Sequence, residues 1–495
     1  MLHRILIANR GEIAVRIIRA CRELGIESVA VYSDADARAP HTMLADRAIR
    51  LGPAPAADSY LSMDAVIDAA RQAGCDAVHP GYGFLSENDR FATRCAEAGL
   101  VFIGPPPDAI ARMGSKIAAR AMAQQAGVPV VPGETPADQS DAAIAAAATR
   151  VGFPLLLKPS EGGGGIGMKV VREGSVLVGA IQQARREAIA AFGDGRLYVE
   201  RLVERPRHVE IQVFADAHGQ AVHLFERECS IQRRHQKVIE ETPSPALTAA
   251  LRAQMGEAAV SIARAAGYRN AGTVEFLLDG TGKHARFYFL EMNTRLQVEH
   301  PVTEQVAGVD LVQAQIAVAS GLPVPWPQDR LSQRGHAIEA RIYAEDAARQ
   351  DLPQAGPLLL YREPRMPGIR VDSGVIEGGE VTVHYDPMIA KVIATAETRE
   401  QARRRLLTAL RQFPILGVRT NISFLINILE HPRFAAGEID TGFLDREAES
   451  VRPHPTTDTP PEVQALAAAV RERGTDARPA QDVIDPWTSL RGARV

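Results

Sequence analysis

The first hundred residues alternate between short apolar runs and amphipathic segments, and this alternation restricts the fold more than any other feature of the chain. Apolar runs at residues 4–8, 28–32, 77–79 and 100–103 predict strands, and the periodicity of residues 12–24, 62–73 and 86–98 predicts helices between them. Strands that alternate with helices form parallel sheets, so we expect an α/β protein with a Rossmann-like N-terminal domain. The first turn, Asn9-Arg-Gly11, has one glycine instead of the GxGxxG pattern, which argues against a dinucleotide site.

Composition excludes several classes of protein. The 495 residues carry 56 basic and 60 acidic side chains, a formal charge of −4, without the positive excess typical of nucleic-acid binding. The longest uncharged run, residues 311–328, is interrupted by three prolines, so we expect no membrane span. Charged residues occupy the place where an export signal would be apolar, and four cysteines lack any CxxC or metal-site spacing. We therefore expect a reducing, cytoplasmic location.

The rest of the chain mixes helices and strands. Residues 107–126 predict one helix, residues 154–158 and 168–171 predict strands around a glycine loop, and residues 209–214 and 222–225 predict sheet strands. Residues 272–278 and 285–292 predict a hairpin around Asp279-Gly-Thr-Gly-Lys283. Further on we expect strands at 337–343 and 381–385 and helices at 400–412 and 421–429. The tail beyond residue 451 is rich in proline, threonine and alanine, with one short helix predicted at 462–472.

Four consecutive glycines occur in the segment Glu161-Gly-Gly-Gly-Gly-Ile-Gly-Met168. Gly162 and Gly167 have the spacing of a Walker A loop, but Met168 stands where that motif requires lysine, and both flanks predict strands rather than a strand and a helix. The pattern therefore favours a mobile hairpin flap whose backbone N–H groups close over phosphates. A flexible surface hairpin without a ligand is the alternative.

Polar residues alternate strictly with less polar ones along the segment that follows the predicted hairpin. The row consists of Glu291, Asn293, Arg295, Gln297 and Glu299. In an extended chain these side chains share one face, and the carboxylate and amide oxygens of the first two suit Mg²⁺. Glu275, on the partner strand, is a third candidate ligand if the hairpin register places it on the same face. A solvent-facing amphipathic strand is the alternative.

Basic side chains gather in Gln232-Arg-Arg-His-Gln-Lys237, which we interpret as a loop after the strand that holds Cys229. Taken alone, such a segment is more often a solvated loop than a site, and Glu240 and Glu241 follow closely enough to neutralise it. Lysine is scarce: 6 of the 56 basic residues are lysines, which reflects either a bias toward arginine or selection of lysine for sites that need a compact ammonium group. The six are Lys116, Lys158, Lys169, Lys237, Lys283 and Lys391.

Several long motifs occur together and in order. They are Ile7-Ala-Asn-Arg-Gly-Glu-Ile13, His79-Pro-Gly-Tyr-Gly-Phe-Leu-Ser-Glu-Asn88, Gly114-Ser-Lys116, Gln232-Arg-Arg-His-Gln-Lys237 and Glu291-Met-Asn-Thr-Arg-Leu-Gln-Val-Glu-His300. With them the chain resembles the biotin carboxylase family of the ATP-grasp superfamily from about Leu2 to Asp445. The resemblance implies a Rossmann-like domain at 1–114, an ATP-grasp domain at 115–333 with a mobile glycine-rich lid at about 131–203, an α+β C-terminal domain at 334–445, and a Pro/Ala-rich tail at 446–495.

The resemblance implies ATP- and bicarbonate-dependent carboxylation of biotin, and it assigns roles to residues at the ATP end of the site. Lys116 and Lys158 would hold the phosphates. The lid glycines Gly163, Gly164 and Gly165 would cover them, Glu200, Arg201 and Val203 would contact adenine, and His208, Gln232 and His235 would lie near the nucleotide. Glu275, Glu291 and Asn293 would bind Mg²⁺ (or Mn²⁺).

It also assigns the residues of the chemical steps. Arg295, Gln297 and the Val298 backbone would bind bicarbonate, which Glu299 would deprotonate for attack on the γ-phosphorus of ATP. Lys237 would steady the resulting carboxyphosphate. Arg341 would stabilise the biotin enolate, and Tyr82 would lie near the biotin ring.

Partners follow from the same resemblance. The chain has no Ala-Met-Lys-Met biotinylation motif, so we expect biotin on a separate carrier protein or domain, together with a carboxyltransferase subunit; a homodimer with Arg19 and Glu23 at its interface is implied as well. The segments Tyr385-Asp-Pro-Met-Ile-Ala-Lys391 and Asp485-Pro-Trp487 look like those of acyl-CoA carboxylase α subunits. The lid departs from the family pattern, with Glu161 at its first position and no basic residue at its second.

Four alternatives remain: the biotin carboxylase subunit of a pyruvate carboxylase or of a urea carboxylase, another ATP-grasp ligase with an amine or thiol acceptor, and a non-catalytic assembly subunit.

Overall fold

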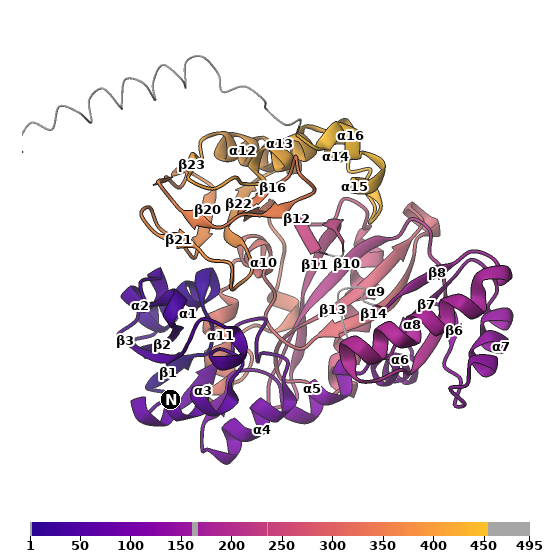
Figure 1. The fold of residues 1–495 in the computed structure, drawn as a ribbon, viewed down its shortest axis with the longest axis horizontal. Coiled ribbons are helices and arrows are strands. Elements are labelled where there is room, and N and C mark those ends of the chain that lie inside the picture. The colour runs from indigo at the N-terminus through magenta and orange to yellow at the C-terminus, as the bar shows by residue number, and fades with distance from the viewer. Residues whose placement is uncertain (1, 161–166, 235, 454–495) are drawn as a thin grey trace, which may run out of the picture. The chain divides into compact units, whose positions relative to one another are not determined.

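The computed structural model describes residues 2–160, 167–234 and 236–453 (Figure 1). The predicted lid residues Gly163, Gly164 and Gly165, the departing Glu161, His235 and the tail with its predicted helix and Asp485–Trp487 segment lie outside these ranges. Among the helices that the structure describes, none is long and apolar enough to cross a membrane.

The N-terminal sheet has five parallel strands in the order β3-β2-β1-β4-β5, as the alternation predicts. Its strands are β1 Arg4–Ile7, β2 Glu27–Ser33, β3 Arg47–Gly52, β4 Ala77–His79 and β5 Val101–Phe102, and its helices are α1 Gly11–Glu23, α2 Pro40–Leu44, α3 Met63–Ala73 and α4 Asp89–Glu97. The sequence pattern missed β3 because this edge strand is largely exposed and carries two arginines instead of a buried apolar run.

The helix predicted at 107–126 is wrong as a single element. The structure has α5 Pro107–Gly114 and α6 Lys116–Gln125, separated by Ser115 in an extended conformation. The backbone N–H of Lys116 donates to the carbonyl of Ser160 (3.1 Å) and so ties the second helix to the end of a lid strand. The break places Lys116 in the first turn of a helix instead of in the middle of one.

A small four-stranded sheet with its own core forms the next part of the chain, drawn in magenta in Figure 1. Its order is β6-β9-β7-β8, with β6 Gly133–Glu134, β7 Leu155–Pro159, β8 Lys169–Val171 and β9 Leu197–Arg201, and it packs with α7 Asp141–Val151 and α8 Leu177–Phe192. Strands β7 and β8 pair antiparallel, with Leu157 opposite Lys169. The predicted arrangement of two strands around the glycine loop is therefore confirmed.

One antiparallel sheet of eight strands, ordered β14-β13-β10-β11-β12-β15-β22-β20, runs from the middle of the chain into its C-terminal part. Its members are β10 Arg207–Ala215, β11 Ala221–Arg233, β12 Gln236–Thr242, β13 Asn270–Asp279, β14 Arg286–Asn293, β15 His336–Tyr343, β20 Ile369–Ser373 and β22 Met388–Ala396. The predicted hairpin is the β13–β14 pair. Helices α9 Ala249–Ala265, α10 His300–Ala307 and α11 Leu311–Ala319 pack against it.

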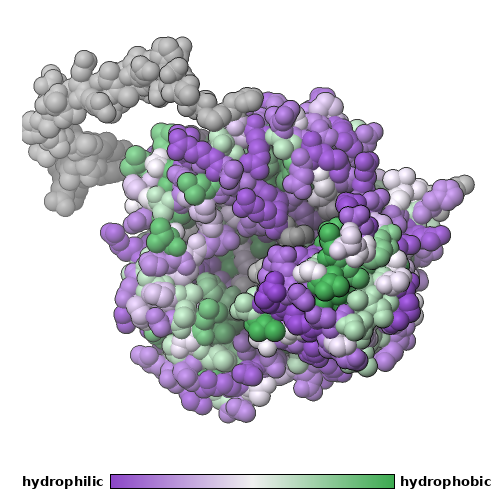
Figure 2. Space-filling view, turned by 45° about the vertical axis from the view of Figure 1, so that its right-hand side comes forward, coloured by the Kyte–Doolittle hydropathy of each residue, from purple (hydrophilic) through white to green (hydrophobic). Residues whose placement is uncertain are grey.

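The C-terminal part adds helices α12 Arg399–Arg411, α13 Ile422–Glu430, α14 Pro432–Ala435, α15 Phe443–Arg446 and α16 Ala448–Val451. Short strand pairs flank them: β16 Glu345–Asp346 with β17 Leu352–Pro353, β18 Gly356–Pro357 with β21 Glu380–Val381, and β19 Leu360–Tyr361 with β23 Ile415–Leu416. The strand predicted at 381–385 is wrong beyond Val381, because Val383 is 81% exposed and its neighbours find no strand partner within the described structure. Figure 2 shows that one face of the molecule is hollowed, with hydrophilic side chains along the upper edge of the hollow and hydrophobic ones gathered below it.

Candidate active site

The alternating polar residues from Glu291 to Glu299 lie on a strand only up to Asn293. β14 ends there, and residues 294–299 form a loop that enters α10 at His300. The prediction of one extended face from residue 291 to residue 299 is therefore wrong. Gln297 and Glu299 are positioned by hydrogen bonds from Arg227, Lys237 and Arg341 instead of by pairing with a neighbouring strand. Gln297 and Glu299 are buried, so the alternative of a solvent-facing strand fails for them as well.

The hairpin register, which the pattern left open, places Glu275 directly opposite Glu291. Opposite residues of an antiparallel pair share a face, and Asn293 Nδ2 donates to Glu275 Oε1 (2.7 Å). Two carboxylates and one amide thus meet at the end of the β13–β14 hairpin. Mg²⁺ prefers such oxygen donors, and the three predicted ligands fit it.

Lys237 connects three carboxylates. It lies on β12 opposite Gln232 of β11, so the basic segment belongs largely to two strands, and its prediction as a loop is wrong. Its Nζ lies 2.5 Å from Glu210 Oε2, 3.0 Å from Glu275 Oε1 and 2.6 Å from Glu299 Oε1. Burial alone would lower the pKa of Lys237, but these carboxylates raise it well above its usual value, so the group is a permanent cation.

The acids next to the basic segment do not neutralise it locally. Glu240 pairs with Arg341 and Glu241 pairs with Arg399, on a strand and a helix far along the chain. Arg233 pairs with Glu345 and Asp351, which anchors the end of β11.

Glu299 is held between two cations. Its Oε1 accepts from Lys237, and its Oε2 accepts from Arg341 Nη2 (2.9 Å). Burial alone would raise the pKa of Glu299, but Lys237, Arg341 and Arg227 together hold it well below its usual range. The carboxylate is therefore ionised at neutral pH, as a proton acceptor must be.

Sequence reasoning missed Arg227, on β11. Its side chain is fully buried, and all five N–H groups are used: by Glu210 Oε1, Gln212 Oε1, Thr303 Oγ1, Thr273 Oγ1 and Gln297 Oε1 at 2.6–3.0 Å. The run Glu226-Arg-Glu228, directly after the strand predicted at 222–225, was a usable signal, because charges in a buried central strand must be paired.

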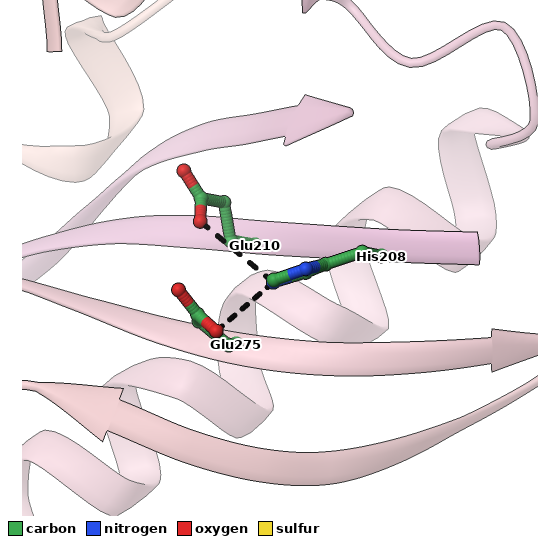
Figure 3. A group of neighbouring side chains, drawn as sticks. All are labelled: His208, Glu210 and Glu275. Carbon is green, nitrogen blue, oxygen red and sulfur yellow. Dashed lines mark ion pairs between the residues drawn. The ribbon is translucent and has the colours of Figure 1, made fainter. Parts of the chain in front are cut away.

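Two lysines lie at the lid side of the site. Lys116 Nζ is 3.2 Å from Glu291 Oε2. Lys158 is buried, and its Nζ is 2.6 Å from Glu200 Oε2; the other oxygen of Glu200, Oε1, pairs with Arg120. Val203 packs with Val131 and Tyr288 in a small apolar cluster, whereas Arg201 is exposed. Lys116 thus pairs with Glu291, Glu291 lies opposite Glu275 in the strand register, and Lys237 contacts both Glu275 and Glu299. Figure 3 shows His208 and Glu210, from β10, beside Glu275 of β13; His208 Nε2 lies 3.0 Å from Glu275 Oε2.

The remaining predicted residues complete the site from three directions. Arg295 Nε contacts Glu87 Oε2 (2.9 Å), and its Nη2 donates to Asn293 Oδ1 (3.1 Å). The Val298 carbonyl accepts from Lys391 Nζ (2.6 Å). Tyr82 donates to Glu12, and the ring of Tyr82 lies 6.0 Å from Lys391 Nζ. Residues separated by more than 300 positions in the chain thereby meet at one place.

Paired strands on both sides of a glycine-rich segment, beside a sheet with buried lysine–carboxylate pairs, are the arrangement typical of ATP-grasp enzymes. Family models match residues 1–110 (biotin carboxylase, N-terminal domain), 115–326 (carbamoyl-phosphate synthase L chain, ATP binding domain) and 339–446 (biotin carboxylase C-terminal domain). The chain belongs to the biotin carboxylase family and is an ATP-dependent ligase.

Individual relatives agree. The biotin carboxylase of Halalkalibacterium halodurans is 52% identical over 444 residues, 90% of this chain and 97% of the relative. The mitochondrial methylcrotonoyl-CoA carboxylase subunit alpha of Dictyostelium discoideum is 48% identical over 99% of this chain and 70% of its own length. The biotin carboxylase domain of Hydrogenobacter thermophilus 2-oxoglutarate carboxylase, solved with MgADP, ADP and bicarbonate, is 42% identical with a TM-score of 0.88, covering 92% of this chain and 100% of that one.

Proposed function

We propose that this chain uses ATP and bicarbonate to carboxylate biotin on a separate carrier protein, as the first half-reaction of an acyl-CoA carboxylase. The observation that carries the proposal is the position of Glu299: an ionised carboxylate between Lys237 and Arg341. Lys237 also contacts Glu275, which lies opposite Glu291 in the strand register, and Glu291 pairs with Lys116. Relatives solved with MgADP and bicarbonate, or named as methylcrotonoyl-CoA carboxylase subunits, support the substrates and the acyl-CoA class.

The nucleotide end of the site binds and orients ATP. Lys116 and Lys158 contact the phosphates as compact positive charges, the lid glycines Gly163 to Gly165 close over them, and residues 200, 201 and 203 bind adenine. His208, Gln232 and His235 line the same end. Mg²⁺ (or Mn²⁺), held by Glu275, Glu291 and Asn293, would neutralise triphosphate charge there.

Bicarbonate binds beside Arg295, Gln297 and the Val298 backbone, and Glu299 removes its proton. The anion competes with Glu299 for Arg341 and Lys237, so its arrival weakens the interactions that depress the pKa of Glu299 and makes the carboxylate a better base. The bicarbonate oxygen then bonds to the γ-phosphorus, the bond to the ADP oxygen breaks, and carboxyphosphate forms beside the permanent cation Lys237.

Carboxyphosphate divides into CO₂ and phosphate, and the phosphate accepts the N1′ proton of biotin. The resulting enolate bonds to CO₂. Arg341 is buried and fixed by Glu240, so it is a preorganised cation for the developing enolate charge. Tyr82, held by Glu12, forms part of the wall beside the biotin ring.

We also propose the domain limits 1–114, 115–333 and 334–445, a homodimer with Arg19 and Glu23 at its interface, and a biotin carrier and a carboxyltransferase as partners. The family-model ranges and the matches to carboxylase α subunits and to a dimeric domain support these assignments. The cysteines of the described part are all unpaired, which supports a reducing compartment such as the cytoplasm.

The test is Glu299→Gln, measured as bicarbonate-dependent ATP hydrolysis with and without free biotin. Loss of the base lowers turnover by about 10²- to 10⁴-fold. The protein still folds and binds ATP, because Lys237 keeps Glu210 and Glu275 and Arg341 keeps Glu240. Undiminished turnover would show that Glu299 is not the base, and ATP turnover that requires an amine or thiol acceptor instead of biotin would show another ATP-grasp ligase.

A further inference from the structure

Two buried glutamates lie directly opposite each other in the central sheet: Glu240, which fixes Arg341, and Glu339, which has no assigned role. Glu240 on β12 pairs in register with Glu339 on β15, and both are 0% exposed. Side chains of opposite residues in an antiparallel pair share a face and lie about 5 Å apart at Cβ. Within the described structure, Oε2 of Glu240 and both carboxylate oxygens of Glu339 have no hydrogen-bond partner.

The pair faces the proposed biotin end of the site. Glu339 and Arg341 are two residues apart on β15 and therefore share a face, and Arg341 Nε donates to Glu240 Oε1 (2.6 Å). Arg341 also reaches Glu299, so one guanidinium serves both the pair and the proposed base. Lys391 lies opposite Arg341 on β22.

The cations near Glu240 and Glu339 do not fully compensate a negative charge on both carboxylates. Burial raises the pKa of Glu240 to about 7, and burial together with Glu240 raises the pKa of Glu339 well above its usual value despite Lys391 and Arg341. The charged or titratable groups around the pair come from several elements: Lys237 on β12, Cys229 on β11, Arg341 and Tyr343 on β15, Lys391 on β22, Glu299 before α10, and Tyr82 from the N-terminal domain.

We propose that Glu240 and Glu339 share one proton and act as a positioning pair for Arg341, with Glu240 anchoring the guanidinium and Glu339 as the neutral acid. One negative charge is enough to orient Arg341. A second would oppose the charge that develops on the biotin enolate and would repel Glu299, because like charges in a buried site interact strongly. The inference rests on the proposed function, since it gives Arg341 its role toward the enolate.

The pair then sets an alkaline limit for biotin-dependent turnover. As pH rises through the apparent pKa of the pair, the shared proton leaves, the site gains a negative charge, and turnover falls. A glutamine side chain is a permanent neutral mimic of the protonated acid, so Glu339→Gln is expected to move the alkaline limb of the pH–rate profile upward by about one pH unit or more, with kcat at pH 7 within about twofold of the wild type. Glu240→Gln is expected to lower kcat by about tenfold or more, because Arg341 loses its anchor.

Glu228→Gln is the matched control. Glu228 is a buried glutamate of the same sheet, on β11, and burial raises its pKa as well, but it bonds to Ser230 and Ser244 away from Arg341. Its substitution leaves the alkaline limb unmoved. An unshifted limb in Glu339→Gln, or an equal shift in both variants, overturns the proposal.

A second readout does not depend on turnover. In the wild-type protein the protonated-carboxyl C=O region of the infrared spectrum contains a component that Glu339→Gln removes and Glu228→Gln retains; a spectrum unchanged by Glu339→Gln overturns the proposal. If the wild type shows no biotin-dependent turnover, the proposed function fails, and the infrared comparison still decides whether the pair holds a proton.

Discussion

Arg227→Lys tests whether the buried guanidinium at the centre of the site has a role that charge alone cannot supply. Arg227 donates five hydrogen bonds, one of them to Glu210 and one to Gln297. Lysine keeps the positive charge but has three donors, so at least 5 − 3 = 2 buried acceptors lose their partner. Each unsatisfied buried acceptor costs about 1–3 kcal/mol, which gives a destabilisation of about 2–6 kcal/mol.

The same substitution changes the geometry of bicarbonate binding. Arg227 fixes Gln297 Oε1, while Gln297 Nε2 donates to Glu275 Oε1 (3.0 Å), so the amide is held at both ends. Without the Arg227 contact the amide is free to turn. We expect the KM for bicarbonate to rise by about tenfold while the KM for ATP changes much less, because the lysines at the ATP end are untouched.

The assay combines thermal unfolding with bicarbonate- and ATP-dependence of turnover. A loss of about 2 kcal/mol or more lowers the unfolding midpoint of a cooperative unit of this size by about 2 °C or more. Arg252→Lys is the control, because the side-chain bonds of Arg252 all go to Glu226, a single carboxylate that an ammonium group can satisfy. An Arg227→Lys protein as stable as the control, with an unchanged KM for bicarbonate, would refute the reasoning.

Three further predictions follow from particular side chains. Burial lowers the pKa of His41 from 6.5 to about 4, so between these pH values the unfolded chain binds more protons than the folded chain. The free energy of unfolding therefore falls by about 2 kcal/mol from pH 7 to pH 5. His41→Gln should show a smaller drop in thermal midpoint over that range. Lys116→Met should raise the KM for ATP by about tenfold or more without destabilising the fold, whereas Lys169→Met, which breaks a pair with Glu187, should leave it nearly unchanged. Chelation by EDTA should abolish ATP turnover, Mg²⁺ or Mn²⁺ should restore it, and Glu291→Gln should raise the metal concentration required; turnover that persists in EDTA would contradict the metal assignment.

Local patterns predicted the elements that a short stretch of chain can determine. The alternation of apolar runs and helical periods indicated the parallel sheet, and glycine positions indicated the β7–β8 flap and the β13–β14 hairpin. Two predictions from local patterns were wrong. The helical periodicity continues through Ser115, yet the helix breaks there. Residues 294–299 alternate in polarity but do not form a strand. Periodicity reports which side chains share a face only when the backbone conformation is already known.

The residues to which we assign chemical roles were recognisable from the sequence because their motifs are long, but their partners were not. Lys237 contacts Glu210, 27 positions away, and also Glu275 and Glu299. Glu240 lies opposite Glu339, 339 − 240 = 99 positions away. The register of the eight-stranded sheet determines these contacts. A charge in a buried strand must find a partner, yet nothing within its own segment specifies which one. The sequence by itself therefore determined which groups we assign to the site, and the tertiary structure decided their protonation and orientation, because both depend on burial and on neighbours brought from distant parts of the chain.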